Sequence, residues 1–347
     1  MLELYKNKRV LVTGAAGTIG TELIKQLLKL DVKEIKAIDN NEEALFTLNA
    51  NYKQNDRVNC SFCDIRDLDR LKYLCRDMEI ILHLAAMKHV EISELSPMDA
   101  IETNAKGTLN VIYAALESDS VKRVIYTSTD KAVNSTNVMG TTKLLGERLM
   151  TAALNIRSSK NIIFASTRFG NVLASKGSVV PVFFNQIKRG QDLTITHPEM
   201  TRFVMTVEEA ANLVLEASLI AQGGEVFVTK MSVINILDLA HAMINLVSPI
   251  FKKEPQDTKI TYIGMQPGEK KYEELMTQEE TLRAIELKNM FVIKPFVKSI
   301  YTDVGCENYK DTVNCIVTKP YISTEEKKMS VSEIETYFHE HSIINRI

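Results

Sequence analysis

The sequence has no hydrophobic run long enough to cross a membrane. A bilayer-spanning helix needs roughly 20 mostly apolar residues in a row, and no stretch of this chain approaches that length. The N-terminal segment MLELYKNKRVLVTG also lacks an apolar core of signal-peptide length. We therefore expect a cytoplasmic protein without a membrane span.

The chain also lacks an excess of charge of one sign. It has 42 basic and 44 acidic residues, which give a net charge of -2. Nucleic-acid-binding proteins usually carry a basic field that attracts phosphates, and nothing here supplies one overall. We therefore expect no nucleic-acid partner.

Cysteine is scarce and odd in number, at five residues. Two of them lie within the segment VNCSFCD, whose apolar flanks indicate a strand rather than a metal-binding knuckle, and a zinc site would need further clustered ligands. Free cysteine behaves as a small hydrophobic residue. We therefore expect no metal site, and we predict core thiols at Cys60, Cys63, Cys75, Cys306 and Cys315.

The first half of the chain alternates short β-rich runs with longer amphipathic stretches. This alternation predicts an α/β fold, with a doubly wound parallel sheet of the Rossmann type covered by helices on both faces. Looser material follows, so we predict a Rossmann domain over residues 1–172 and a smaller lobe over 173–347, with some chain returning to the sheet. A further helix is expected within STEEKKMSVSEIETYF. The predicted strands are RVLVT, EIKAID, VNCSFCD, EIILHLAA, VKRVIYTST and NIIFASTRF.

A glycine-rich turn joins the first predicted strand to the first predicted helix. Glycines at this place permit a tight turn and close approach of the backbone to a pyrophosphate, which the helix N-terminus then stabilises. A plain glycine turn without a ligand is the alternative interpretation. The predicted cofactor contacts in this turn are Thr13, Gly14, Gly17, Thr18, Ile19 and Gly20.

An aspartate ends the second predicted strand, where it can accept hydrogen bonds from both ribose hydroxyls of an adenosine. This residue, Asp39, is followed by Asn40 and by no nearby cation, so a 2′-phosphate would be repelled. The arrangement favours NAD over NADP as the cofactor. A solvated aspartate in a turn is the alternative.

Three further segments, CDIRD, LHLAAMKHV and TSTDKA, resemble the extended short-chain dehydrogenase/reductase family. The resemblance implies adenine contacts from Asp64 and Ile65, and contacts near the nicotinamide ribose from Leu84, Ala85, Ala86 and Lys88. Asn40 and Thr127 are further predicted cofactor contacts. It also implies that Lys88 reaches the substrate.

The span YTSTDKAVNSTNVMGTTKLLGE departs from that family at one position. Most members have a tyrosine that takes the proton of the substrate hydroxyl, with a lysine one helical turn later that lowers its pKa and holds the nicotinamide ribose. Here Met139 stands in place of the tyrosine, while Lys143 is present. Either the enzyme is inactive, or proton transfer is performed elsewhere. The surrounding residues are similar to the UDP-N-acetylglucosamine dehydratase branch, which favours the second interpretation.

The triplet Thr129, Asp130 and Lys131 supplies the chemistry that a 4,6-dehydration needs. After oxidation at C4, a base must remove the C5 proton and an acid must protonate the departing C6 hydroxyl. A desolvated lysine can act as the base and a protonated aspartate as the acid. An exposed ion pair at a strand end is the structural alternative.

The second half of the chain resembles the same dehydratases in the segment from Thr167 to Thr206 and in MQPGEKKYEEL. By that resemblance Arg202 would neutralise phosphate, for which its planar fork is suited. The other implied substrate contacts are Asn171, Ser178, Val179, Val180, Thr194 and Glu269.

These patterns predict an NAD-dependent UDP-N-acetylglucosamine 4,6-dehydratase, a lyase that forms a UDP-4-keto-6-deoxy-hexosamine. The expected partners are the UDP-sugar and further copies of the same chain. A UDP-sugar 4-epimerase and a non-catalytic NAD-binding scaffold remain as alternatives. The intact Asp130 and Lys131 pair argues against the scaffold.

Overall fold

The computed structural model describes residues 1–347 except 157–160, 176, 266–267 and 297–303. The chain forms two compact units. Unit 1 contains residues Met1–Phe169, Glu208–Lys230 and Met276–Pro320, and unit 2 contains Gly170–Val207, Met231–Leu275 and Tyr321–Ile347. The second half of the chain therefore contributes two segments to unit 1.

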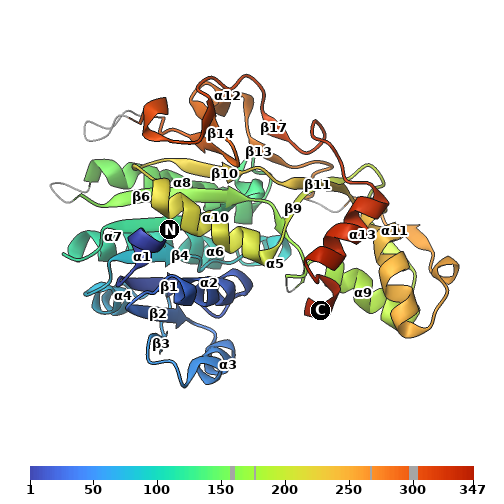
Figure 1. Cartoon of the computed structure of the whole chain (residues 1–347), viewed down its shortest axis with the longest axis horizontal. Helices are drawn as coiled ribbons and strands as arrows, with labels where there is room; N and C mark the ends of the chain where they lie inside the picture. Colours follow the sequence, from blue (N-terminus) through green and yellow to red (C-terminus); the bar gives the residue numbers. More distant parts are fainter. Residues whose placement is uncertain (157–160, 176, 266–267, 297–303) are drawn as a thin grey trace. The chain divides into compact units, whose positions relative to one another are not determined.

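Unit 1 is built on a ten-stranded sheet with the order β16-β14-β15-β10-β6-β5-β4-β1-β2-β3. From β3 to β10 all neighbouring strands are parallel, and Figure 1 shows them following one another across the sheet. This confirms the predicted doubly wound fold and all six predicted strands. The strands are β1 (Arg9–Thr13), β2 (Glu34–Asp39), β3 (Val58–Phe62), β4 (Ile80–His83), β5 (Arg123–Thr129), β6 (Ile163–Phe169), β10 (Val226–Thr229), β14 (Ala284–Leu287), β15 (Met290–Ile293) and β16 (Thr312–Asn314).

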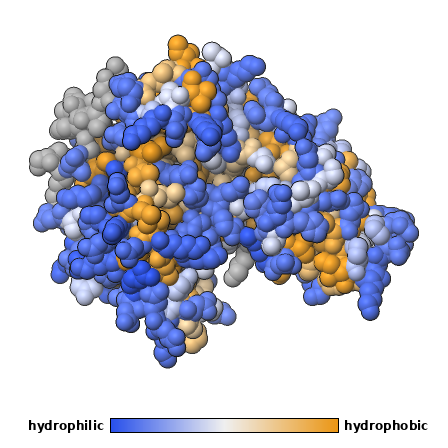
Figure 2. Space-filling model, viewed as in Figure 1, coloured by the Kyte–Doolittle hydropathy of each residue, from blue (hydrophilic) through white to orange (hydrophobic). Residues whose placement is uncertain are grey.

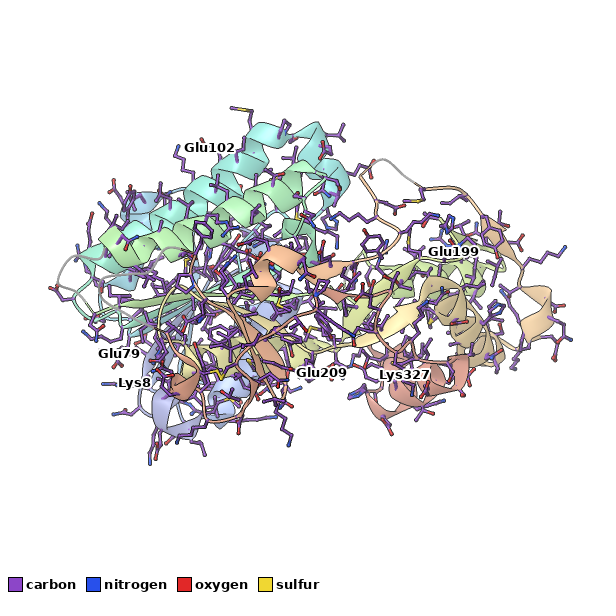
Figure 3. All side chains as sticks on the ribbon, turned by 90° about the horizontal axis from the view of Figure 1, so that it is seen from above. Lys8, Glu79, Glu102, Glu199, Glu209 and Lys327 are labelled. Carbon is purple, nitrogen blue, oxygen red and sulfur yellow. A yellow bond between two sulfur atoms is a disulfide. The ribbon has the colours of Figure 1, made fainter. Side chains whose placement is uncertain are left out.

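The helices of unit 1 connect these strands. Figure 3 shows α7 and α8 lying side by side along one face of the sheet, with the labelled Glu102 on the outer side of this layer. The helices are α1 (Leu2–Tyr5), α2 (Thr18–Lys29), α3 (Glu42–Tyr52), α4 (Leu68–Cys75), α5 (Val90–Leu95), α6 (Pro97–Ala100), the π-helix η1 (Ile101–Lys106), α7 (Gly107–Glu117), the 3-10 turn η2 (Asp130–Ala132), α8 (Val138–Ile156), α10 (Val207–Ile220) and α12 (Gln278–Thr281).

Unit 2 is a smaller mixed structure. It has three small sheets with the orders β11-β9-β7, β12-β8 and β13-β17. The predicted late helix is confirmed as α13, where Ser330 and Glu333 form a capping box. The elements are β7 (Asn171–Val172), α9 (Val179–Arg189), β8 (Leu193–Ile195), β9 (Thr201–Met205), β11 (Ser232–Asn235), α11 (Ile236–Val247), β12 (Ile260–Tyr262), β13 (Glu274–Met276), β17 (Tyr321–Ile322) and α13 (Val331–Glu340).

Each unit has its own apolar core. In unit 1 side chains from β1, β4, β5, α4 and α7 pack together, and in unit 2 the cluster joins α9, α11 and α13. On the face drawn in Figure 2, hydrophilic residues predominate and apolar residues form smaller patches. Among the residues that the structure describes, no helix is both long enough and apolar enough to span a bilayer.

The cysteine prediction is wrong for two of the five residues. Cys63 and Cys75 are buried thiols as predicted, and Cys60 is half-buried. Cys306 and Cys315 instead form a disulfide, with their Cα atoms 5.7 Å apart. Between the two cysteines the chain forms the short turn Cys306–Asn308 and the edge strand β16, and so brings them together. This segment has no apolar pattern from which its fold could be predicted.

Candidate active site

The glycine turn lies where the strand order reverses, between β1 and β4. Gly14 has a φ of +67°, and a Cβ atom there would lie 2.7 Å from the amide nitrogen of Ala85. A Cβ at Gly20 would lie 2.4 Å from the carbonyl oxygen of Gly14. The surrounding backbone therefore excludes side chains at both positions, and the turn stays tight at the switch point typical of dinucleotide binding.

The start of α2 and the end of β2 meet at this turn. The helix begins after Gly17, and no side chain caps its N-terminus. The Asp39 carboxylate accepts hydrogen bonds from the amides of Ala16 and Asn41, each at 3.0 Å. The acidic group is thus fixed beside the glycine turn, while uncapped amides at the helix start suit an anion. Thr18 and Ile19 form the first turn of this helix.

The predicted adenine-contacting pair lies at the end of β3. Asp64 binds the Arg66 guanidinium at 2.7 Å and accepts a hydrogen bond from Asn40 at 3.3 Å. The Arg66 hydrogen bonds lower the pKa of Asp64 to about 2. Ile65 is buried. Its side chain packs so closely on Gly107 that a Cβ atom there would clash with it.

A buried polar chain that the sequence analysis did not identify supports the loop after β4. Thr13 Oγ1 accepts hydrogen bonds from the amides of Leu84 and Ala85, each at 3.1 Å, so its own proton is directed to His83 Nδ1 at 2.7 Å. His83 then carries its proton on Nε2, which lies 3.1 Å from Thr108 Oγ1. Burial lowers the pKa of His83 to about 3, so the imidazole stays neutral.

The same loop is held at its other end by Asn104, within the π-helix η1. Its side chain accepts from the Met87 amide at 2.7 Å, donates to the Met87 carbonyl at 3.0 Å and donates to Thr142 Oγ1 at 3.0 Å. The loop that contains Ala86 is thereby tied to α8. Lys88, the last predicted residue of the loop, is exposed. A π-helical turn often marks a functional site, and this irregularity is not visible in a sequence.

The triplet at the end of β5 forms one hydrogen-bonded cluster. Thr129 Oγ1 donates to Asp130 Oδ1 at 2.7 Å, and Lys131 Nζ lies 3.0 Å from Asp130 Oδ2. The Asp130 side chain is 4% exposed and that of Lys131 is 34% exposed. The pair is therefore not the exposed surface ion pair of the alternative interpretation. A Cβ at Gly140 would lie 2.0 Å from the Lys131 carbonyl oxygen, so α8 packs directly on this turn.

The first two turns of α8 carry Met139 and Lys143. Met139 is buried, at 3% exposure, and has no proton to transfer. Lys143 Nζ donates to the Thr127 carbonyl at 2.6 Å and lies 4.2 Å from the centre of the Tyr126 ring. Burial lowers the pKa of Lys143 to about 7, although the nearby Glu147 opposes the shift. This lysine is poised between its charged and neutral forms at neutral pH.

Because β1, β2, β4 and β5 are parallel, Thr13, Asp39, His83 and Thr129 all stand at the same edge of the sheet of unit 1. Unit 1 therefore brings the predicted cofactor residues and the predicted acid–base residues to one edge.

Unit 2 contains a separate cluster around Glu273. The Asn171 amide donates to both Glu273 carboxylate oxygens, at 2.8 and 2.9 Å. Arg202 Nε lies 3.3 Å from the same carboxylate, and its side chain is 16% exposed. Glu273 follows the predicted Glu269 in the motif PGEKKYEEL, so the signal was present in the sequence. Asn171 and Arg202 are thus brought together, whereas Glu269 is exposed and follows the turn at Gly268.

The remaining predicted substrate residues lie around α9. Ser178 precedes the helix, and its buried hydroxyl has no hydrogen-bond partner in the described part of the chain. Val179 and Val180 form the first helical residues, with Val180 buried. Thr194, in β8, accepts a hydrogen bond from Gln186 of α9 at 2.9 Å. A buried hydroxyl without a partner beside an uncapped helix N-terminus is an arrangement that suits an anionic ligand.

Comparison with known proteins identifies relatives over most of the chain. The family model described as polysaccharide biosynthesis protein matches residues 10–295. An uncharacterized membrane protein of Methanocaldococcus jannaschii is 45% identical over 95% of this chain and 97% of its own length. The capsular polysaccharide biosynthesis protein CapD of Staphylococcus aureus is 41% identical over 79% of this chain, which spans only 46% of CapD. A UDP-glucose 4-epimerase of Rickettsia massiliae is 34% identical over 96% of this chain and 95% of its own.

Two solved structures share the fold. Pen from Bacillus thuringiensis has a TM-score of 0.90 at 38% identity and covers 98% of this chain, which in turn covers 99% of Pen. DesIV, a dTDP-glucose 4,6-dehydratase from Streptomyces venezuelae solved with NAD bound, has a TM-score of 0.65 at 20% identity over 75% of this chain and 86% of DesIV.

Proposed function

This chain belongs to the polysaccharide biosynthesis protein family, and from that premise we propose that it is an NAD-dependent UDP-N-acetylglucosamine 4,6-dehydratase. The family joins nucleotide-sugar dehydratases and epimerases, so the finer assignment depends on the residues of the site.

The observation that carries the proposal is the acid–base pair of a buried Asp130 and a partly exposed Lys131, beside a position without a tyrosine. Asp130 and Lys131 supply the acid and the base that dehydration needs and that epimerisation does not. Met139 leaves no phenol at the place where other family members have one. The pair fits a reaction that breaks bonds at C5 and C6.

The residues of unit 1 fit NAD. Gly14 and Gly20 keep the turn between β1 and α2 tight, because a Cβ at either position would clash with neighbouring backbone. Asp39 would bind the adenosine ribose without tolerating a 2′-phosphate, and Lys143 would hold the nicotinamide ribose. When bound, NAD supplies the hydride acceptor and donor for the substrate. DesIV, which has this fold, binds NAD, and this supports the assignment.

Thr129 provides a route for the proton of the C4 hydroxyl. Its hydroxyl donates to Asp130 at 2.7 Å, so a proton accepted by Thr129 Oγ1 from the substrate is passed on to the carboxylate. The carboxylic acid formed in this way protonates the C6 hydroxyl, which departs as water. Lys131, as a neutral amine, removes the C5 proton, exchanges it with solvent as an ammonium group, and later delivers a proton to C5. Both side chains end in the state in which they began, and the substrate has lost one water.

The residues of unit 2 would bind the UDP part of the substrate. Arg202 would contact the diphosphate with its bidentate fork, with Asn171 and Glu273 holding the guanidinium and its surroundings in place. The unpartnered Ser178 hydroxyl and the N-terminus of α9 would add further donors to an anion.

The direct test is incubation of the protein with UDP-N-acetylglucosamine and NAD, followed by mass spectrometry and NMR at C5. Loss of one water with exchange of the C5 hydrogen for solvent deuterium supports the dehydratase. Lys131→Ala and Asp130→Asn are expected to reduce turnover by roughly 100-fold or more each, whereas Lys122→Ala, at an exposed lysine, leaves it unchanged. Unimpaired C5 exchange in Lys131→Ala would exclude this lysine as the base.

A UDP-sugar 4-epimerase is the second candidate, because the Rickettsia relatives carry that name at 34% identity over almost the whole chain. The same incubation separates the two. An epimerase converts the substrate into its C4 epimer of equal mass, without loss of water and without exchange at C5.

A further inference from the structure

A cavity lies in unit 1 along the last turns of α8. It has a volume of about 530 Å³, and its lining includes Arg148 and Leu154 of α8, Arg283 after α12, and Phe296 after β15. The residues proposed to bind NAD occupy the first turns of α8 and the opposite ends of the strands. Met139 and Thr151 are 12 residues apart on the helix, or about 18 Å along its axis.

Arg283 enters this cavity with part of its hydrogen-bonding capacity unused. One terminal nitrogen donates to the Lys294 carbonyl, and the other lies 3.5 Å from Glu279 and 3.7 Å from Glu280. Its Nε is buried and has no hydrogen-bond partner among the residues that the structure describes. A buried donor without an acceptor is unfavourable, and a negative charge in the cavity would stabilise the guanidinium group electrostatically.

The side chains that line the cavity also carry more positive than negative charge. Arg148 makes no ion pair with any residue in the described part of the chain, and among the described residues that line the cavity Glu279 is the only acidic one. The Glu279 side chain is 55% exposed and already directed to Arg283. Two guanidinium groups against one solvated carboxylate favour a ligand with negative charge.

The other walls are apolar. Ala152 and Leu154 come from α8, and Phe296 is 72% exposed although it is a large aromatic residue. Apolar walls with a few convergent polar groups are typical of small-molecule sites. A ligand that satisfies both features has an apolar body and a single anionic head.

We propose that this cavity binds a small amphipathic organic anion, with its carboxylate, sulfonate or phosphate head on Arg283 and Arg148 and its apolar body against Leu154 and Phe296. The proposal stands apart from the dehydratase function and does not depend on it. It assigns a ligand site outside the residues proposed for NAD and for the UDP-sugar.

The test uses 8-anilinonaphthalene-1-sulfonate as the probe, with the full-length protein and with saturating NAD and UDP present to occupy the nucleotide-binding residues. We expect saturable fluorescence with one site per chain. Arg283→Met is expected to weaken the probe's affinity by about tenfold or more, since it removes charge-assisted hydrogen bonds. The control Arg189→Met removes an exposed arginine from α9 in unit 2 and should leave the affinity unchanged.

Two further comparisons test the proposed site even if Arg283→Met folds poorly. Ala152→Trp fills the cavity without changing its charge and should abolish binding. The neutral analogue N-phenyl-1-naphthylamine should bind at least about tenfold more weakly than the sulfonate. Equal affinity of the two dyes, or unchanged binding in Ala152→Trp, would overturn the proposal.

Discussion

Lys143 should reduce the stability of the protein at neutral pH, although it supports the proposed function. Its ammonium group is buried beneath the sheet edge, and burial lowers its pKa from 10.5 to about 7. The unfolded chain binds this proton up to pH 10.5, whereas the folded chain binds it only up to about pH 7. Between these values the unfolded state holds more protons, so the free energy of unfolding rises with pH.

The size of this change in the free energy of unfolding follows from the difference between the two pKa values. A difference of about 3.5 pKa units, at roughly 1.36 kcal/mol each, amounts to about 5 kcal/mol between its two ends. Lys143→Met has similar length and no charge, so it removes this pH dependence. It also leaves the Thr127 carbonyl, now 2.6 Å from the lysine, without its donor, at a cost of about 1–3 kcal/mol.

Lys143→Met is therefore expected to be more stable than the wild type by about 2–4 kcal/mol near pH 7 and less stable above about pH 9, so that the two stability curves cross. NAD affinity should fall in the variant, because the proposed ribose contact is lost.

The assay is urea denaturation of nucleotide-free protein at several pH values from about 7 to 10, followed by far-UV circular dichroism. Circular dichroism is preferable to intrinsic fluorescence because the chain has no tryptophan. The matched control is Lys122→Met, at an exposed lysine, which should run parallel to the wild type. A Lys143→Met curve that is also parallel, or a loss of stability near pH 7, would refute the reasoning.

The other predictions concern the cofactor and the acid–base turn. NADP should bind at least about tenfold more weakly than NAD because the Asp39 carboxylate repels a 2′-phosphate, and Asp39→Ala should narrow the gap in titrations with both cofactors. Met139→Tyr should stay within about tenfold of the parent turnover or fall through crowding, and a large gain in rate would mean that removal of the C4 proton is limiting in the parent. Gly140→Ala forces a methyl group against the Lys131 carbonyl, 2.0 Å away, so turnover should fall about 100-fold or more. The exposed neighbour Thr141→Ala should be nearly neutral in the same assay, and full turnover in a folded Gly140→Ala variant would contradict the expected displacement.

Much of unit 1 could be predicted from the sequence because its strands are buried on both faces. Such strands form short apolar runs, as in RVLVT and VKRVIYTST, and these runs are visible without any knowledge of neighbours. The strands β14, β15 and β16 were not predicted. They join the sheet antiparallel after a long excursion through unit 2, and their pairing depends on contacts that no local pattern encodes.

Some residues of the candidate site could likewise be predicted from the sequence, and others could not. Gly14, Asp39 and the triplet at residues 129–131 follow directly from strands, so their positions at one sheet edge were implied by the strand pattern. His83 lies in an apolar strand segment and Asn104 in a helical segment, so neither stands out in the sequence. Their roles become visible only through the hydrogen bonds of His83 to Thr13 and of Asn104 to Met87.

The sequence by itself determined the parallel sheet, the glycine turn and the acidic residue at the end of the second strand, because each depends on residue types at short spacings. Only the tertiary structure decided the Cys306 and Cys315 disulfide, the pairing of Arg202 with Glu273 and the burial that brings the pKa of Lys143 to about 7. These features depend on which segments meet and on how much water is excluded around them. Contact and desolvation are properties of the folded chain, and a local pattern does not specify either one.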